Sequence, residues 1–323
     1  MTPEMEVYLA KEQVAVDTPE TPLDGDDFIQ VTPDSKVEAV PAFEDTETVQ
    51  GKYGLDPSTR GLVNATANLG CFIRSRGDAD ATYVPDFHRL AIAGGLQFTE
   101  ILCVGSKSKF KYSPATTYAN HKALTIWHHS GGVGIGQSII RKIGNIQGGW
   151  KITGKTGAKG KFDLVDGKGV YIEEVAGTKP AVTPSSIIYP AILPLTVSID
   201  GVVYNVLDFS FEGGNTVDQY IKCSDQYGYG ASEITKKKGK FDVTVYSDVS
   251  KQFPMAKVLD GTLEAAIALT YGPTGKKIEI AAAYPQYKDC KFEQSGNLSV
   301  WKVTGELTEN DFSITVNSDL VAA

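Results

Sequence analysis

The stretch from Gly149 to Thr156 has the residue types and spacing of a phosphate-binding loop, G-x-x-x-x-G-K-T. Such a loop follows a strand and opens a helix, so that the helix N-terminus faces the phosphates. The residues from Gly157 to Val165 are broken by glycine and then alternate like a strand. We therefore predict a strand here and no nucleotide site. The enzymatic alternative would require ATP binding that the change Lys155→Ala abolishes.

Two neighbouring stretches also carry residue types that bind ligands. Gly131–Gly136 is as rich in glycine as a dinucleotide fingerprint, yet no frame places its last glycine where a strand ends and a helix opens. We interpret this stretch as a loop. His128 and His129 are adjacent, and adjacent side chains on a strand point to opposite faces of the sheet. They cannot hold one metal ion together, and we expect both to be solvated.

The cysteines and one lysine cluster complete the candidates. The cysteines are far apart, without a CxxC pair or histidines at zinc spacing, so we expect reduced packing residues. They are Cys71, Cys103, Cys223 and Cys290. Lys236–Lys240 contains four lysines, which form either a solvated loop or a charge partner for a neighbouring subunit. We predict no catalytic, cofactor-binding or metal-binding residues, and a protein that is not an enzyme.

The composition narrows the class of protein further. With a net charge of −8 over 323 residues, the chain lacks the basic face that grips nucleic acid through its phosphates. No run approaches the ~20 apolar residues of a membrane helix. The opening residues, Met1–Glu6, lack the basic start and apolar stretch of a secretory signal. We expect a protein that stays in the cytoplasm and has no membrane partner.

An internal repeat suggests how the chain is organised. Trp150–Gly154 reads Trp-Lys-Ile-Thr-Gly, and Trp301–Gly305 reads Trp-Lys-Val-Thr-Gly. Upstream, Arg60–Ala67 resembles Lys238–Val245 in having a basic residue, a glycine and then a strand-like run. The spacings predict a duplicated unit whose first copy holds roughly 27 extra residues in a loop. We interpret the two tryptophans as equivalent core residues, one in the core of each copy.

The sequence between the repeated segments predicts β-strands. Short alternating runs bounded by glycine or proline indicate strands at 28–31, 37–40, 62–69 and 195–204, the last with an Asp-Gly hairpin turn. A proline start, helical spacing of apolar residues and a glycine stop predict one short helix at 85–96, with a counterpart at 250–259. Residues 106–112 and 123–127 are predicted to pair as a long hairpin.

The predicted fold class is mainly β, with two tandem β-sandwich or barrel domains, each with one helix. An acidic N-terminal arm would occupy residues 1–27, with an apolar anchor at Val7–Ala10. The first β domain would span 28–177 and the second 191–323. The proline-spaced stretch 178–190 would link them.

Several of these segments together resemble bacteriophage major tail tube proteins. They are the arm with Val7–Glu12, the strand Leu62–Phe72 before the helix Pro85–Leu96, the stretch Tyr112–Trp127, and Gly144–Phe162. The likeness covers most of residues 1–175. It implies tail-tube-like β domains, an N-terminal arm and a long hairpin loop that reaches the next ring.

The resemblance also implies a structural virion protein whose subunits close into rings that stack along the tail. DNA and a length-setting tape measure protein would pass through an acidic bore, with tail terminator and baseplate or tip proteins at the two ends. Two tube folds per chain predict a trimeric, pseudo-sixfold ring, and a second copy that is only an outer decoration predicts a hexamer. The protein would be in the virion, and in the host cytoplasm during assembly.

Two expectations follow for the arm and for the class of function. We expect the acidic arm and the basic residues near 104–122 to meet between rings, so that deleting residues 2–25 leaves folded subunits that do not polymerise. The alternative function is a β-sandwich adhesin that binds glycans and remains monomeric.

Overall fold

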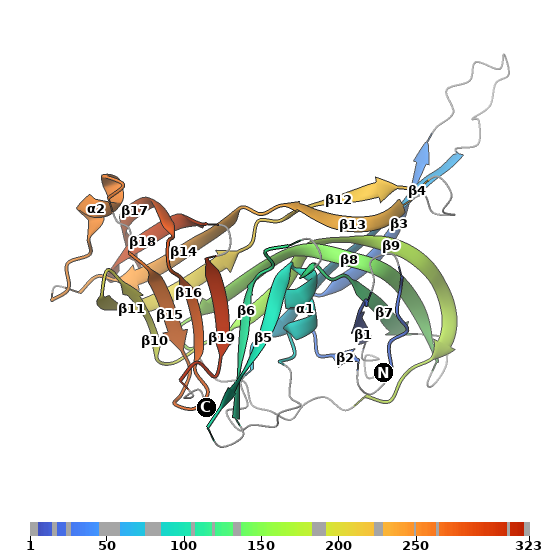
Figure 1. Ribbon diagram of the computed structural model, residues 1–323, viewed down its shortest axis with the longest axis horizontal. Coiled ribbons are helices and arrows are strands. Elements are labelled where there is room, and N and C mark those ends of the chain that lie inside the picture. The colour runs from blue at the N-terminus through green and yellow to red at the C-terminus, as the bar shows by residue number, and fades with distance from the viewer. Residues whose placement is uncertain are drawn as a thin grey trace, which may run out of the picture.

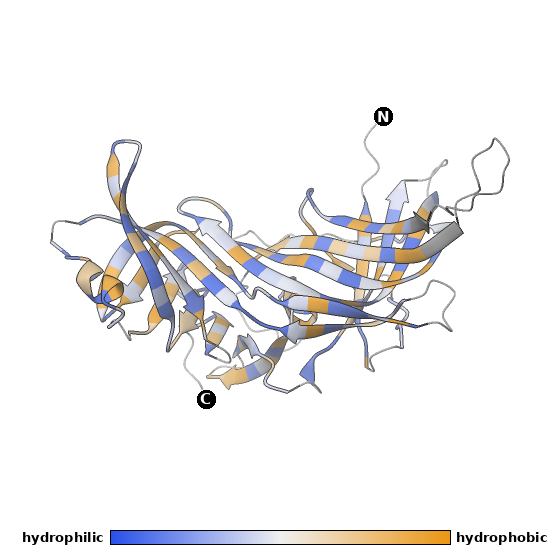
Figure 2. Cartoon of the chain, turned by 90° about the horizontal axis from the view of Figure 1, so that it is seen from above, coloured by the Kyte–Doolittle hydropathy of each residue, from blue (hydrophilic) through white to orange (hydrophobic). Residues whose placement is uncertain are grey.

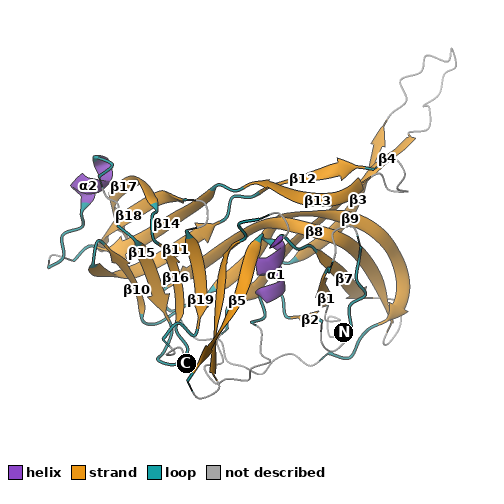
Figure 3. Cartoon of the chain, viewed as in Figure 1, coloured by secondary structure: helices purple, strands orange, loops and turns teal. Residues whose placement is uncertain are grey.

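The computed structural model is built almost entirely of antiparallel β-strands with two short helices (Figure 3). This confirms the mainly β fold predicted from the strand texture. The structure describes residues 6–14, 18–23, 27–44, 59–74, 85–104, 107–117, 120–131, 137–182, 192–222, 229–248, 250–262, 265–308 and 311–319. The predicted glycine loop 132–136, Cys223 and most of the predicted linker lie outside these residues.

Eight strands form a central sheet that runs through both halves of the sequence (Figure 1). In spatial order they are β3 (Lys36–Glu44), β4 (Thr59–Phe72), β9 (Lys161–Thr178), β8 (Gln137–Lys155), β11 (Val202–Glu212), β14 (Gly239–Tyr246), β18 (Leu298–Leu307) and β17 (Gln286–Ser295). The halves meet where Lys151–Lys155 of β8 pairs with Asp208–Glu212 of β11.

A second sheet packs against the central one and also mixes strands from both halves. In spatial order it holds β5 (Leu96–Cys103), β6 (Lys107–Pro114), β19 (Phe312–Val316), β16 (Ile278–Ala282), β15 (Ile267–Tyr271) and β10 (Leu195–Ile199). β11 joins the two sheets, because its first residues pair with β10 and those after the bulge at Val206/Asp208 pair with β14. The predicted turn is confirmed: Asp200 and Gly201 have φ of 51° and 74°, which a two-residue type I′ hairpin requires.

The N-terminal segment is part of the fold and not a free arm. β1 (Val7–Glu12) pairs with β7 (Leu124–Gly131) along its whole length and with β2 (Phe28–Ile29). The predicted anchor Val7–Ala10 is buried in full. β7 in turn pairs with the first half of β8.

The predicted long hairpin between residues 106–112 and 123–127 is wrong. Both segments are strands, β6 and β7, but β6 pairs with β5 and β19 in the second sheet. β7 pairs with β1 and β8 instead. The reason is sequence distance: β5 ends at Cys103 and β6 begins at Lys107, so a short connection closes that hairpin at a lower entropic cost.

The duplication appears in the order in which the strands pair. In the first unit the spatial order is β3-β4-β9-β8, and in the second it is β11-β14-β18-β17. In both units the first two strands of the spatial order also come first in the chain, then a helix, a β-hairpin in the second sheet, and last the other two strands in the reverse of their spatial order. The helices are α1 (His88–Ala93) and α2 (Met255–Leu259), and the hairpins are β5–β6 and β15–β16.

This order corrects the prediction that the repeated sequences Trp150–Gly154 and Trp301–Gly305 lie on equivalent strands. β8 corresponds to β17 and β9 to β18, so Trp150 and Trp301 lie on strands that do not correspond. The extra strand β7 occupies the region where the spacing predicted inserted residues in the first copy. Another insertion, the hairpin of β12 (Thr216–Ile221) and β13 (Tyr229–Lys236), leaves the second unit between β11 and β14 and lies over β8 and β9 (Figure 1).

The core between the sheets is one continuous cluster of buried apolar side chains. It includes Trp150 and Ile152 from β8 together with Val303 from β18. The expectation of one core per copy is therefore wrong, because β8–β11 and β6–β19 pairing join the halves in both sheets. Trp150 is buried and stacks on Phe312 at 4.6 Å, whereas Trp301 is half-buried at the edge of the cluster.

Candidate assembly surfaces and the junction between the units

The stretch spelled like a phosphate-binding loop lies in β8, which confirms the prediction of a strand. Gly154 pairs with Phe209, and Lys155 pairs with Asp208 on β11. The chain then turns and continues as β9, so within these described residues no helix follows the stretch. Its residues make a sheet junction instead.

His128 and His129 do point to different partners, but the prediction that they are solvated is wrong. The His128 ring stacks on Tyr8 of β1 with centroids 4.4 Å apart, and its Nε2 lies 3.3 Å from the Glu6 carboxylate. His129 is 3% exposed, and its Nδ1 lies 3.1 Å from the Ser138 hydroxyl. Burial lowers the pKa of His128 even though Glu6 opposes it. β1 covers this histidine, which no local pattern could indicate.

The lysine cluster has partners within the chain. The Lys237 ammonium donates to the Ala115 carbonyl at 2.7 Å, Lys238 lies 3.4 Å from Glu306, and Lys240 lies 3.2 Å from Glu212. A charge partner on a neighbouring subunit is therefore not needed to explain the cluster. Lys237 is half-buried and fixes β13 to the loop after β6.

The cysteines within the described residues are free and buried, as predicted. Burial raises the pKa of Cys71, and it raises that of Cys290 to about 11, so both thiols are protonated at neutral pH. Among the described residues, no group of three or more His, Cys, Asp or Glu side chains is placed to hold a metal ion.

A carboxylate, an imidazole and a hydroxyl form a chain that the sequence did not suggest. Glu12 of β1 lies 2.8 Å from Nε2 of His88 at the start of α1, and Nδ1 of His88 lies 3.1 Å from the Tyr112 hydroxyl on β6. In an open site such a relay could activate a nucleophile. Tyr112 is 0% exposed, however, so the hydroxyl is closed to any substrate. The three residues tie β1 to the helix and the second sheet.

Glu12 should make stability depend on acid pH. Burial disfavours its ionised form, but His88 and Lys122 outweigh burial and lower the pKa to about 2, from an ordinary value of 4.5. Its stabilising contribution is therefore complete above pH 4.5 and is lost as pH falls toward 2.

We expect Glu12→Gln to lower the free energy of unfolding at pH 7 by on the order of 3 kcal/mol and to flatten its dependence on pH between about 5 and 2. Denaturant melts across that range check the result. Glu38→Gln, which alters an exposed carboxylate, is the control and should leave the slope unchanged. Parallel curves for wild type and Glu12→Gln would contradict the role given to Glu12.

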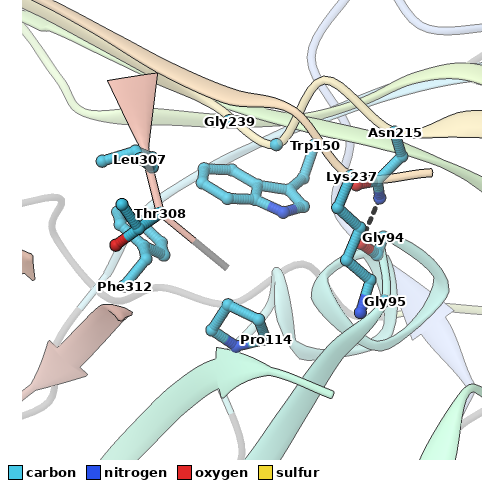
Figure 4. Close-up of a pocket in the computed structure, with 11 residues that line it drawn as sticks. Gly94, Gly95, Pro114, Trp150, Asn215, Lys237, Gly239, Leu307, Thr308 and Phe312 are labelled. Atoms are coloured by element: carbon cyan, nitrogen blue, oxygen red, sulfur yellow. Dashed lines mark hydrogen bonds between the residues drawn. The ribbon is translucent and has the colours of Figure 1, made fainter. Parts of the chain in front are cut away.

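The root of the β12–β13 hairpin closes the junction between the units around Trp150 (Figure 4). Asn215 donates its side-chain amide to the carbonyl of Gly94 at the end of α1 (2.7 Å) and to that of Gly148 on β8 (3.0 Å). The cavity that remains measures about 30 Å³, which suits a water molecule and is far below the ~300 Å³ of small-molecule pockets. Its lining is Gly94, Gly95, Pro114, Trp150, Gly213, Asn215, Lys237, Gly239, Leu307, Thr308 and Phe312.

The face of the central sheet that points away from the core carries a row of alternating charges. Direct cross-strand neighbours run from Asp163 to Lys151, Glu212, Lys240 and Glu306 on β9, β8, β11, β14 and β18. Glu212 lies 3.2 Å from Lys240 and 3.9 Å from Lys151. Seen from above, hydrophilic and hydrophobic residues alternate along the long strands of the molecule (Figure 2).

Reversing the middle charge of this row tests its contribution. Glu212→Lys would place three ammonium groups side by side, and we expect the free energy of unfolding to fall by about 1–2 kcal/mol, since each cross-strand pair contributes ~0.2–1 kcal/mol. Salt should restore part of the loss. Chemical denaturation at low and high salt measures both effects. Glu293→Lys on the outer strand β17 is the matched control. An equal loss of unfolding free energy in that variant would contradict a stabilising contribution from the charge row.

Both ends of the central sheet have open edges within the described residues. β3 pairs only with β4, and β17 only with β18. β17 has ten residues with backbone groups that no further described strand pairs; β3 has nine, of which Pro41 has no N–H and Val37 uses its carbonyl to accept from Arg141. Phe292 on β17 is 55% exposed and Val40 on β3 is 56% exposed. Such edges are templates for pairing with another chain.

Comparison with protein-family models gave no match, and comparison with curated protein sequences gave none at a significant level. In the described part of the chain, no helix is long and apolar enough to cross a membrane.

Proposed function

We propose that the protein is a self-assembling structural subunit and that three copies close a ring through β17 of one copy and β3 of the next. The supporting observation is the junction inside the chain. There β8, which ends the spatial order of the first unit, pairs with β11, which begins the spatial order of the second unit. Because β17 corresponds to β8 and β3 to β11, the same contact can be repeated between copies. A repeated head-to-tail contact of this kind generates a closed ring when the rotation fits.

The size of the ring follows from the strand count. Three copies of an eight-stranded sheet give 24 strands, and both units share that sheet, which favours the trimer over a hexamer with an outer decoration. With strands ~4.8 Å apart and tilted by ~40°, the closed sheet would be about 48 Å across at the backbone. Side chains reach about 5 Å inward, and the β12–β13 hairpin of each copy lies over the same face at β8 and β9, so the bore would be narrower than the backbone diameter.

Such rings fit the role of a bacteriophage major tail tube protein. Stacked rings would conduct DNA and hold the tape measure protein, with terminator and tip proteins at their ends, in the virion after assembly in the host cytoplasm. The lining would differ from the acidic bore that the resemblance implies. Its acids are matched by lysines on neighbouring strands, so few free ammonium groups are available to hold phosphate.

Negative-stain microscopy of the purified chain, with sedimentation velocity over a range of concentrations, tests the proposal. We expect rings or tubes of uniform diameter whose abundance rises with concentration. Isolated particles at the highest concentration would contradict it. A monomer that binds on a glycan array would favour the adhesin alternative.

A further inference from the structure

The two helices of the repeat differ in how well they are covered. α2 packs on β17 beside a cavity of about 500 Å³. Met255 and Leu259 of the helix are 36% and 59% exposed, and Tyr284 at the cavity is 73% exposed. Of the α2 residues only Val258 is buried. The cavity is lined by Lys257, Val258, Gly261, Tyr284, Pro285, Gln286, Tyr287 and Thr308; we call it the α2 pocket.

The corresponding place in the first unit is filled. α1 packs on β8, the counterpart of β17, and all of Leu90–Ala93 is buried. Its C-terminal end is covered by the connections that lead out of β11 and into β14, from which Asn215 reaches the Gly94 carbonyl. Only a water-sized cavity remains there. The covering segments belong to the unit that follows along the sheet.

We propose that the α2 pocket receives a second copy of this chain, which enters with the end of its β3–β4 pair. β3 and β4 correspond to β11 and β14, the strands whose connections cover α1. The inference rests on the proposed ring, because the unit that follows β17 belongs to the next copy. It assigns an occupant to a surface of mixed polar and apolar side chains that is open in the single chain and lies beside an open sheet edge.

Burial explains why this contact would matter. Met255 and Leu259 of α2 and Tyr284 at the pocket are large, exposed apolar or aromatic groups, and we expect the neighbouring copy to remove them from water when it pairs with β17. Edge pairing alone supplies backbone hydrogen bonds that suit many strands. The α2 pocket would add the shape that selects β3 and sets its register.

The first experiment places a photo-cross-linking amino acid at position 259 in a mixture of isotopically heavy and light chains. We expect cross-links between heavy and light chains that join position 259 to peptides from β3 or β4. Cross-links confined to one chain, or to another surface of the second copy, would overturn the assignment.

The second experiment compares Leu259→Glu with Leu102→Glu, which changes a residue of the same type that is 65% exposed on β5. We expect Leu259→Glu to raise the concentration for half-assembly at least tenfold, and Leu102→Glu to leave it within twofold. Met255→Gln, a milder change on the same helix, should give an intermediate shift, and the thermal melt of each unassembled variant should match wild type. If wild type forms rings and Leu259→Glu does too, only the pocket assignment fails. If wild type forms no rings, the proposed function fails first.

Discussion

Deleting residues 2–12 is expected to leave a chain that does not fold cooperatively. β1 is a buried strand of the sheet: Val7, Tyr8, Leu9 and Ala10 are each at most 3% exposed. Each larger apolar side chain among them contributes ~1.5–3 kcal/mol through burial. Their joint loss, with the Glu12 contacts, is comparable to the whole stability margin of roughly 5–15 kcal/mol.

This result would reverse the expectation from sequence that deleting residues 2–25 leaves folded subunits unable to polymerise. Circular dichroism and a thermal melt of the truncated chain measure the loss directly. Deleting residues 2–5 is the control, since it leaves all of β1 in place and should keep a cooperative melt. A truncated chain that lacks residues 2–12 yet melts cooperatively would show that β1 is dispensable.

Trp150→Ala is expected to have the second largest effect. The Trp150 ring is 4% exposed and stacks on Phe312 at 4.6 Å, and the carbonyl of Trp150 accepts the N–H of Gly213. Truncation of such a ring costs ~3–5 kcal/mol. For a chain of this length that corresponds to a fall in Tm of about 4–7 °C.

The comparison with Trp301→Ala makes this prediction sharper. Trp301 is half-buried and packs between Phe253 and Phe292 at the edge of the core. Its truncation should lower Tm by about half as much, and Lys155→Ala should change it by less than 1 °C, because surface substitutions usually stay within ±0.5 kcal/mol. Differential scanning calorimetry of the unassembled variants decides the order. Equal losses for the two tryptophans would contradict the different burial of the two rings.

Local signals in the sequence predicted the elements well. Proline and glycine bound the short helix α1, and the Asp200-Gly201 pair forms the hairpin turn between β10 and β11. The alternation of apolar and polar residues indicates β4, β8 and β11. Each of these features depends on a few neighbouring residues. The strand at the phosphate-loop spelling was predictable for the same reason, because the residues after it do not favour a helix.

Pairing between distant strands could not be predicted in this way. β6 pairs with β19, which lies about 200 residues further along the chain. Neither strand contains a sequence signal that identifies the other as its partner. The burial of His128 under β1 and the Glu12–His88 contact depend on the same kind of long-range pairing. The repeat was detectable, but aligning Trp150 with Trp301 matched β8 to β18, two strands that do not correspond. The pairing order identifies the units, and the sequence carries that order only weakly.

The sequence contains a local signal for the charge row. Alternate residues on β8 and β11, such as Lys151, Thr153, Ser210 and Glu212, are polar and lie on one face. The alternation of sign arises only across strands, so it appears once the register is known.

Two units of the same topology form one eight-stranded sheet, and we propose that its open ends join between copies. Cryo-electron microscopy of assembled rings tests this pairing through their symmetry and strand count. We expect threefold rings with a continuous 24-stranded sheet in which β17 of each copy pairs with β3 of the next. Six chains per ring, or rings in which β3 and β17 remain unpaired, would contradict it.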